Sequence, residues 1–235
     1  MHRLLLTLLV TSSMSLSLLF ADEPTDLDAL RSQAAGGDAK AQLDLAIRYR
    51  DGKGVTKDDV EAMQWGHRAA DAGNAEAMDF VGFAYLRGAV VERNPVIAIG
   101  YFKAAAEQSP QAAFNLGQCY FGAQGTEQDV PKALESWKKA AEGGHGRAAG
   151  SLAMVYLSGE GVAPDAAQAR QFAERAAELN DPSGLVVLGE MQFQAGELDA
   201  AKATWTKASK LRPTGPTGHL EPRRFAESAQ QGADL

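Results

Sequence analysis

Residues 41–76 read AQLDLAIRYRDGKGVTKDDVEAMQWGHRAADAGNAE, and this stretch decides the fold. In its first half, Ala46 and Tyr49 lie one and four residues after Leu45, so the three side chains share one face of a helix. Two glycines interrupt that pattern, and the apolar residues of the second half follow helical spacing again: Ala62, Trp65 and Ala69. The stretch therefore predicts a helix, a turn and a second helix, neither of which buries its apolar face alone.

The same unit recurs along the chain with a nearly constant period. One small residue in each first helix recurs at steps of 36, 35, 36 and 36 residues, and one alanine in each second helix at steps of 36, 35, 36 and 32. The small residues are Ala46, Gly82, Gly117, Ala153 and Gly189, and the alanines are Ala62, Ala98, Ala133, Ala169 and Ala201. Five registered copies predict an all-α solenoid of stacked helix hairpins with one continuous interior.

The small residue in each first helix has a packing role. A larger side chain there would overlap the facing helix, so we expect the two helices of a unit to approach closely at this point. Each second helix carries an aromatic residue that we expect to point inward: Trp65, Tyr101, Trp137, Phe172 and Trp205. Trp137 and Trp205 stand one place later in their units than the other three, which predicts that these two helices are slightly rotated.

The two ends of the chain differ from the repeated part. Residues 1–21 have a short basic start, an apolar run, and Ala21 before an acidic segment, which is the layout of a secretory signal peptide. The alternative is an uncleaved membrane anchor, but we expect cleavage and no membrane span afterwards. Residues 26–37 copy only a second helix and are expected to cap an array over 22–213. Residues 214–235 are expected to form a linker and a tail or short helix.

Composition and motifs argue against several classes of function. The formal net charge of −7 indicates neither a nucleic acid nor an anionic membrane as partner. Cys119 is the single cysteine, so we expect no disulfide and a small buried side chain at that position. The sequence has no HExxH, paired CxxC or GxSxG motif. We therefore expect no catalytic residues, no metal site and no cofactor.

The repeated segments resemble a known family. LAMVYLSGEGV at residues 152–162 and KALESWKKAAEGGHGRA at 132–148 are similar to the Sel-1-like repeat, a relative of the tetratricopeptide repeat. The last unit, LGEMQFQAGELDAAKATWTKASKLRP at 188–213, resembles a tetratricopeptide unit itself. The resemblance implies a right-handed α/α solenoid of about five helix-turn-helix repeats. It also implies that the array binds other proteins.

The resemblance further implies a concave groove lined by the first helices. Its positions fall on apolar side chains with arginines at the edges: Leu43, Ile47, Phe83, Leu86, Phe114, Phe121, Met154, Leu157, Val186 and Phe193, with Lys40, Arg50, Arg87 and Arg147. Two interpretations stay open. Either the array curves so tightly that these positions belong partly to the core, or they form a groove for an apolar peptide or helix whose acidic flanks are steered by the basic edges.

These observations predict a protein-binding scaffold or adaptor that is exported, either to the periplasm or as a secreted protein, and has no catalysis of its own. An accessory module of an enzyme or a cryptic hydrolase is the alternative from another class. Purely structural self-association through the terminal helices is a third interpretation. The sequence identifies neither the partner nor the pathway.

Overall fold

The computed structural model describes residues 26–88 and 90–211, and this part of the chain consists of eleven α-helices with no strand. The predicted all-α class is therefore confirmed. The helices are α1 (Asp26–Ala35), α2 (Ala39–Asp51), α3 (Asp59–Asp71), α4 (Ala75–Arg87), α5 (Pro95–Ala105), α6 (Pro110–Phe121), α7 (Val130–Glu142), α8 (Gly146–Ser158), α9 (Ala166–Glu178), α10 (Pro182–Gln194) and α11 (Leu198–Leu211). The expected signal segment 1–21 and tail 214–235 lie outside the described residues.

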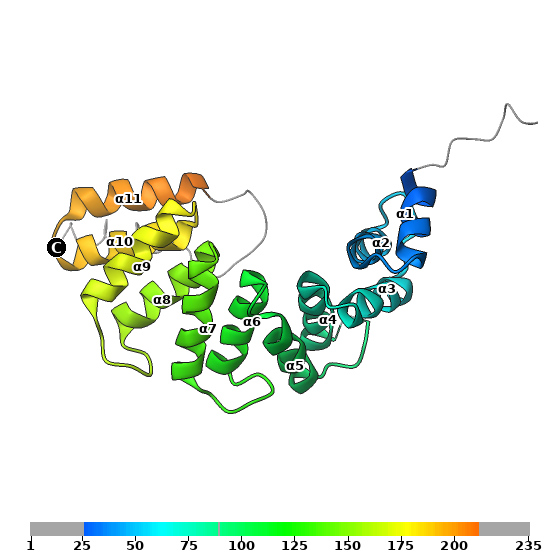
Figure 1. Ribbon diagram of the computed structural model, residues 1–235. Helices are drawn as coiled ribbons and strands as arrows, with labels where there is room; N and C mark the ends of the chain where they lie inside the picture. Colours follow the sequence, from blue (N-terminus) through cyan, green and yellow to red (C-terminus); the bar gives the residue numbers. More distant parts are fainter. Residues whose placement is uncertain (1–25, 89, 212–235) are drawn as a thin grey trace, which may run out of the picture.

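The helices form five antiparallel hairpins that stack into an arc (Figure 1). The hairpins are α2–α3, α4–α5, α6–α7, α8–α9 and α10–α11, preceded by α1 as a half-unit. Each helix packs on the next one in the chain, and α4 also contacts α6 while α8 contacts α10. The largest buried cluster runs without interruption from α5 to α9. The predicted stack of hairpins is thus the observed architecture, but its interior is not continuous: α1 and α2, α2 to α4, α8 to α10, and α11 have separate buried clusters.

A cap of the same kind starts nearly every helix and repeats with the period of the array. In each case a side chain accepts a hydrogen bond from a backbone N–H of the first turn, which is worth about 1 kcal/mol per helix. The first-helix caps are Asp38, Asn74, Ser109, His145 and Asp181, and the second-helix caps are Asp58, Asn94, Asp129 and Asp165. Of these nine residues, only His145 is not an aspartate, asparagine or serine.

The two helices of a hairpin meet where a glycine of the first faces an aromatic ring of the second. A Cβ added to the glycine would lie 2.8 Å from the ring in the second hairpin, 2.4 Å in the third and 2.3 Å in the fifth. The pairs are Gly82 with Phe102, Gly117 with Trp137, and Gly189 with Trp205. Because no real Cβ sits so close to a ring atom, glycine is required for this helix spacing.

The other two hairpins solve the same packing problem with small residues on both helices. Their first helices have Ala46 and Ala153 at the glycine position, and their second helices have Gly66 and Ala173 at the aromatic position. Ala153 and Ala173 belong to one buried cluster. At this position a large side chain on the second helix is therefore found only where the first helix has a glycine. In the first hairpin the space beside Gly66 is filled by Phe80 of α4, in the next hairpin.

The expected rotation of α7 and α11 is wrong. The leading alanines of all five second helices are at most 2% exposed, so these helices turn the same face inward. Trp137 and Trp205 stand one place later because they fill the glycine gap, and they are 2% and 3% exposed. In the second hairpin Phe102 fills the space left by the glycine, and the neighbouring Tyr101 is half-buried. Trp65 and Phe172, which face no such gap, are also only half-buried.

We expect Gly117→Ala to lower the free energy of unfolding by about 1–3 kcal/mol, because the new methyl group overlaps the Trp137 indole. Gly100→Ala is the matched control, since Gly100 is exposed within α5 and an added Cβ meets nothing within 4 Å. It should stabilise by about 0.5–1 kcal/mol through helix propensity. Urea denaturation followed by circular dichroism measures both changes.

A double-mutant cycle isolates the contact. In a Trp137→Ala background, which copies the Ala153–Ala173 hairpin, Gly117→Ala should no longer cost stability. Equal costs of Gly117→Ala in the two backgrounds would show that the ring does not set the helix spacing.

Candidate functional site

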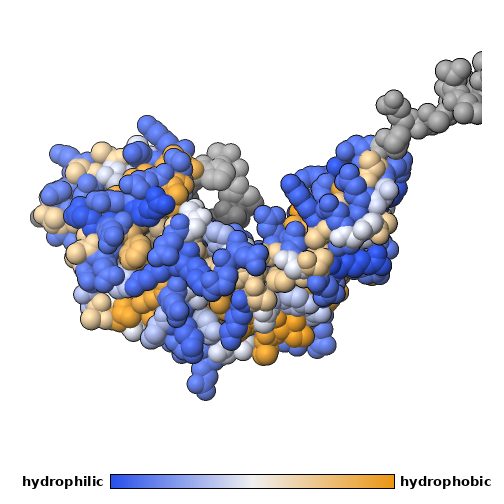
Figure 2. Space-filling view, viewed as in Figure 1, coloured by the Kyte–Doolittle hydropathy of each residue, from blue (hydrophilic) through white to orange (hydrophobic). Residues whose placement is uncertain are grey.

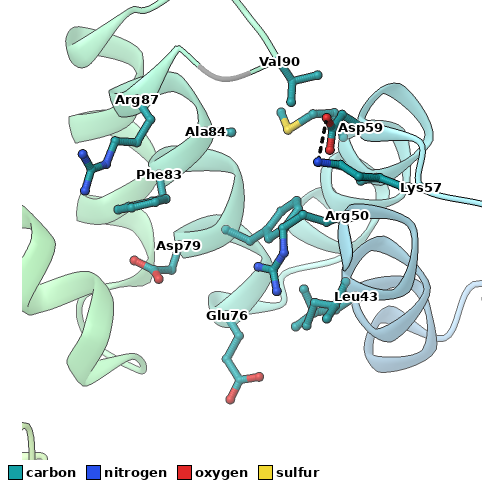
Figure 3. A pocket seen from close by; sticks show the side chains of 14 residues that line it. Leu43, Arg50, Lys57, Asp59, Glu76, Asp79, Phe83, Ala84, Arg87 and Val90 are labelled. Atoms are coloured by element: carbon teal, nitrogen blue, oxygen red, sulfur yellow. Dashed lines mark ion pairs between the residues drawn. The ribbon is translucent and has the colours of Figure 1, made fainter. Parts of the chain in front are cut away.

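A cavity of about 480 Å³ opens between α2, α3 and α4, the first hairpin and the first helix of the second (Figure 3). Its wall is mostly apolar and comes from three helices and the loop after α4. The apolar lining residues are Leu43, Ile47, Ala62, Met63, Phe80, Phe83, Ala84 and Val90. Phe83 is 43% exposed and Val90 is also exposed, so the cavity presents large apolar side chains to solvent. This volume is in the range of sites that take a small ligand or a few side chains of a partner.

The predicted groove residues divide into two sets. In the first two hairpins, five of the six predicted residues line the cavity: Leu43, Ile47, Arg50, Phe83 and Arg87. The sixth, Leu86, is partly buried against the main core. The remaining predicted residues pack elsewhere: Phe114, Phe121, Met154, Leu157, Val186 and Phe193. The structure therefore brings five of the predicted residues together and separates the others from them.

The second set is largely occupied with packing inside the array. Phe114 is 4% exposed and stacks on the His145 ring, with 4.4 Å between ring centroids. The Phe121 ring lies 5.2 Å from that of Trp137, and Met154 and Leu157 pack on a buried cluster between α8 and α10. Only Phe193 remains well exposed. For these positions the core interpretation describes the structure, whereas the first two hairpins leave an open apolar surface.

Two of the basic groups beside the cavity already have acidic partners from this chain. Arg50 Nε lies 2.8 Å from Asp51 Oδ1, and that hydrogen bond lowers the pKa of Asp51 to about 2. Lys57 Nζ lies 3.4 Å from Asp59 Oδ2. Arg87 instead places its guanidinium 5.1 Å from the centroid of the Phe83 ring, a cation–π contact. The basic edge expected to steer acidic partners is thus weaker than the sequence implied.

Asp79 is a cavity residue that the sequence analysis missed. Adding one period of 36 to Leu43 gives Asp79, and a further 35 gives Phe114, so the carboxylate occupies a position on the inner stripe that is apolar in neighbouring hairpins. Asp79 is absent from the apolar pattern because it is charged, but the repeat register alone identifies its position. Burial raises the pKa of the Asp79 carboxyl to about 6, and a hydrogen bond from Asn115 limits the rise.

A chain of hydrogen bonds links Asp79 to His145 across three hairpins. Asn115 Nδ2 donates to Asp79 Oδ1 at 2.7 Å, and Gln111 Nε2 donates to Asn115 Oδ1 at 3.2 Å. The next link joins His145 Nε2 to Gln111 Oε1 at 3.1 Å. Every donor points toward the carboxylate, so the chain is polarised by the negative charge of Asp79.

The far end of this chain fixes the protonation state of His145. The backbone N–H of Ala148 donates to His145 Nδ1 at 3.2 Å, so Nδ1 is an acceptor and the proton is on Nε2. Burial lowers the pKa of His145, and the positive charge of Arg147 lowers it further. The neutral ring therefore caps α8 and donates to Gln111 at the same time.

Other reactive groups are scarce in the part of the chain that the structure describes. Cys119 is fully buried, as expected, and burial raises the pKa of its thiol to about 11. Within residues 26–88 and 90–211, no group of three or more His, Cys, Asp or Glu residues is placed to hold a metal ion. None of the described helices is long and apolar enough to cross a membrane.

Comparison with known proteins places this architecture in a family. The Sel1 repeat model matches residues 39–74, 75–109, 110–145 and 147–181, which are the first four hairpins. The chain belongs to the Sel1 repeat family. Members of this family generally act as protein–protein interaction scaffolds and are typically not enzymes. The resemblance inferred from the sequence is therefore confirmed.

Several Sel1 repeat structures superpose on the chain. A crystal structure of c5321, a protective antigen present in uropathogenic Escherichia coli strains, is 32% identical, with a TM-score of 0.73 over 79% of this chain and 41% of that one. A Sel1 repeat protein from Oxalobacter formigenes is 26% identical, with a TM-score of 0.72 over 88% and 93%. The secretory immunoglobulin A-binding protein EsiB of E. coli O6:H1 is 41% identical over 69 residues, which are 29% of this chain and 14% of EsiB.

We expect Asp79→Asn to stabilise the protein at pH 7.5 and to have little effect at pH 4. The native carboxyl binds its proton more tightly than the ordinary value of 3.8, so its contribution to stability is fully present below pH 4 and is lost as the pH rises through 6. Asparagine keeps an acceptor for Asn115 and carries no charge. Urea unfolding at pH 4, 5, 6 and 7.5 measures the difference, with the exposed Asp199→Asn as control; a pH-independent difference contradicts the assignment.

His145→Asn should show the opposite dependence on pH. The native state prefers the neutral ring, so the contribution of the cap to stability is fully present above the ordinary histidine pKa and is lost as the pH falls through the lowered pKa of His145. Asparagine caps without titrating. The variant should therefore gain on the wild type as the pH falls from 7.5 to 5, measured in the same unfolding experiment. If the two proteins lose stability in parallel, His145 does not cap α8 as a neutral ring.

Proposed function

We propose that this chain is an exported adaptor that binds a segment of another protein on the concave side of the array, with the cavity between α2 and α4 as the main contact. The observation that carries the proposal is the open apolar wall around Phe83. The other predicted groove residues are mostly covered by packing. The apolar side chains around Phe83 are instead exposed, and this exposure has no structural use in the array. Anchoring pockets of this kind hold the residues that contribute most of the binding energy at protein interfaces.

The same cavity favours a segment of chain over a flat protein surface. It is a trough between α2 and α4, the first helices of neighbouring hairpins (Figure 3). A helix or an extended segment lying along such a trough places one or two side chains inside it and the rest along the rim. The α4 residues Glu76, Phe80, Phe83 and Arg87 follow one helical face, so the trough offers contacts along three turns.

Export is proposed from the sequence of the first 21 residues. The segment has the basic, apolar and small-residue order of a secretory signal. We therefore infer that the partner is met in the periplasm or outside the cell. The name of EsiB says that this relative binds secretory immunoglobulin A, but the match spans 14% of EsiB, so an immunoglobulin is one candidate for this chain among exported proteins.

Photocrosslinking tests the proposal. With p-benzoylphenylalanine in place of Phe83, we expect covalent adducts with a discrete partner when the protein is expressed in its own host. Val96 is the matched control, because it is an exposed apolar residue on α5, outside the cavity. Adducts at both positions, or at neither, would show that the cavity is not the binding surface.

A second variant separates binding from folding. Phe83→Ser should abolish co-purification of the crosslinked partner and leave the helical circular dichroism and the unfolding midpoint nearly unchanged, because the ring is 43% exposed. A large loss of stability would instead assign Phe83 to the core.

A further inference from the structure

We propose that the cavity between α2 and α4 recognises a positively charged side chain next to an apolar one, so that a lysine or arginine of the partner pairs with Asp79 while its neighbour enters the apolar wall. This inference rests on the proposed binding function and adds the chemistry of the bound segment. It also reverses the charge that the sequence led us to expect for the partner.

Within the described residues, the Asp79 carboxylate is held through only one of its two oxygens. Asn115 holds Oδ1 by a 2.7 Å hydrogen bond, and Oδ2 has no hydrogen-bond partner within residues 26–88 and 90–211. The side chain lines the cavity and is half-buried. Burying a charge is costly unless it is paired, and here one oxygen is fixed in position while the other remains available to a ligand.

No ion pair joins Asp79 to a cation of the described helices around it. From α2, Arg50 pairs with Asp51, and Lys57 before α3 pairs with Asp59. From α4 itself, Arg87 lies over the Phe83 ring, and from α5, Lys103 lies over the Tyr120 ring. Helix α6, which carries Asn115, has no charged side chain.

Charge is distributed unevenly along the cavity. Glu76 lies one turn before Asp79 on α4 and also lines the cavity, and no ion pair joins it to a described residue. In Figure 3 Glu76 and Asp79 lie on the same side of the Phe83 ring, and Arg87 lies beyond that ring. One end of the cavity is therefore acidic, and the apolar wall begins directly beside it. An ammonium or guanidinium group is complementary to this end.

The aromatic rings beside Asp79 also favour a cationic ligand. Phe80 and Phe83 both line the cavity near Asp79, and each already has an arginine of this chain over its face, Arg50 at 5.6 Å and Arg87 at 5.1 Å. Aromatic faces attract cations, and the methylene stem of a lysine or arginine packs well on such rings while its charged end reaches a carboxylate. A carboxylate ligand at this end would meet two like charges.

Three small probes with one shared body test the inference: phenethylamine, 3-phenylpropionate and 2-phenylethanol, which are cationic, anionic and neutral. Each is titrated into the ¹⁵N-labelled full chain, and shifts of the backbone amides of α4 report binding. At pH 7.5 we expect phenethylamine to bind about fivefold more tightly than 3-phenylpropionate, the effect of one partly exposed charge pair.

Two controls attach the preference to Asp79. In Asp79→Asn, which keeps the acceptor for Asn115, the amine and the acid should bind within about twofold of each other, whereas Asp199→Asn should behave as the wild type. At pH 5 the wild type should lose most of the preference as the Asp79 carboxyl takes up its proton. Dispersed spectra of each variant confirm that it is folded.

The outcomes are separable from those of the proposed function. Equal binding of the three probes, tighter binding of the anion, or a preference that survives Asp79→Asn would each overturn the inference and leave the crosslinking result untouched. Binding of none of the probes would show that the cavity is not a ligand site for such groups. A preference for the amine that depends on Asp79 supports it.

Discussion

The structure depends on how closely two helices can approach within one repeat. Gly117 and Trp137 show the constraint most clearly, because the indole occupies the space that any Cβ at residue 117 would need. Three hairpins pair a glycine with an aromatic ring in this way, and the other two have small residues at both positions. Helices fixed at this distance can stack with a constant offset, and that offset turns a 36-residue sequence period into an arc (Figure 1).

The function that we propose uses the apolar surface that packing between the hairpins leaves exposed. In the middle hairpins the inner positions are taken up by packing, as at Phe114 and Phe121, while in the first two hairpins Phe83 and its neighbours face an open cavity. The surface also differs along the array: Figure 2 shows polar side chains over most of this face, with apolar ones gathered in separate patches. The hydrogen-bond chain from Asp79 to His145 ties the cavity to the centre of the array, so the position of the carboxylate depends on three hairpins at once.

Much of the fold could be predicted from the sequence because the sequence repeats with a nearly constant period. The register of Ala46 with Gly82 and Gly117 is a local feature repeated five times, and repetition makes weak helical signals certain. The site was only partly predictable. Phe83 and Ile47 line the cavity, but exposure at an inner position depends on how tightly neighbouring hairpins stack, which the sequence does not encode in any single unit. The repeat register was sufficient to identify Asp79. The hydrogen bonds made by Asn115 and Gln111 could not be predicted, because they depend on side-chain directions between hairpins.

The central claim, that the contact within each hairpin sets the helix spacing for its neighbours as well, can be tested by amide hydrogen exchange of the wild type and Trp137→Ala. The account predicts that amides of α6 and α7 lose protection together, that α5 and α8 follow to a smaller degree, and that α2 and α11 keep theirs. Loss of protection confined to α7, or spread equally from α1 to α11, would contradict it.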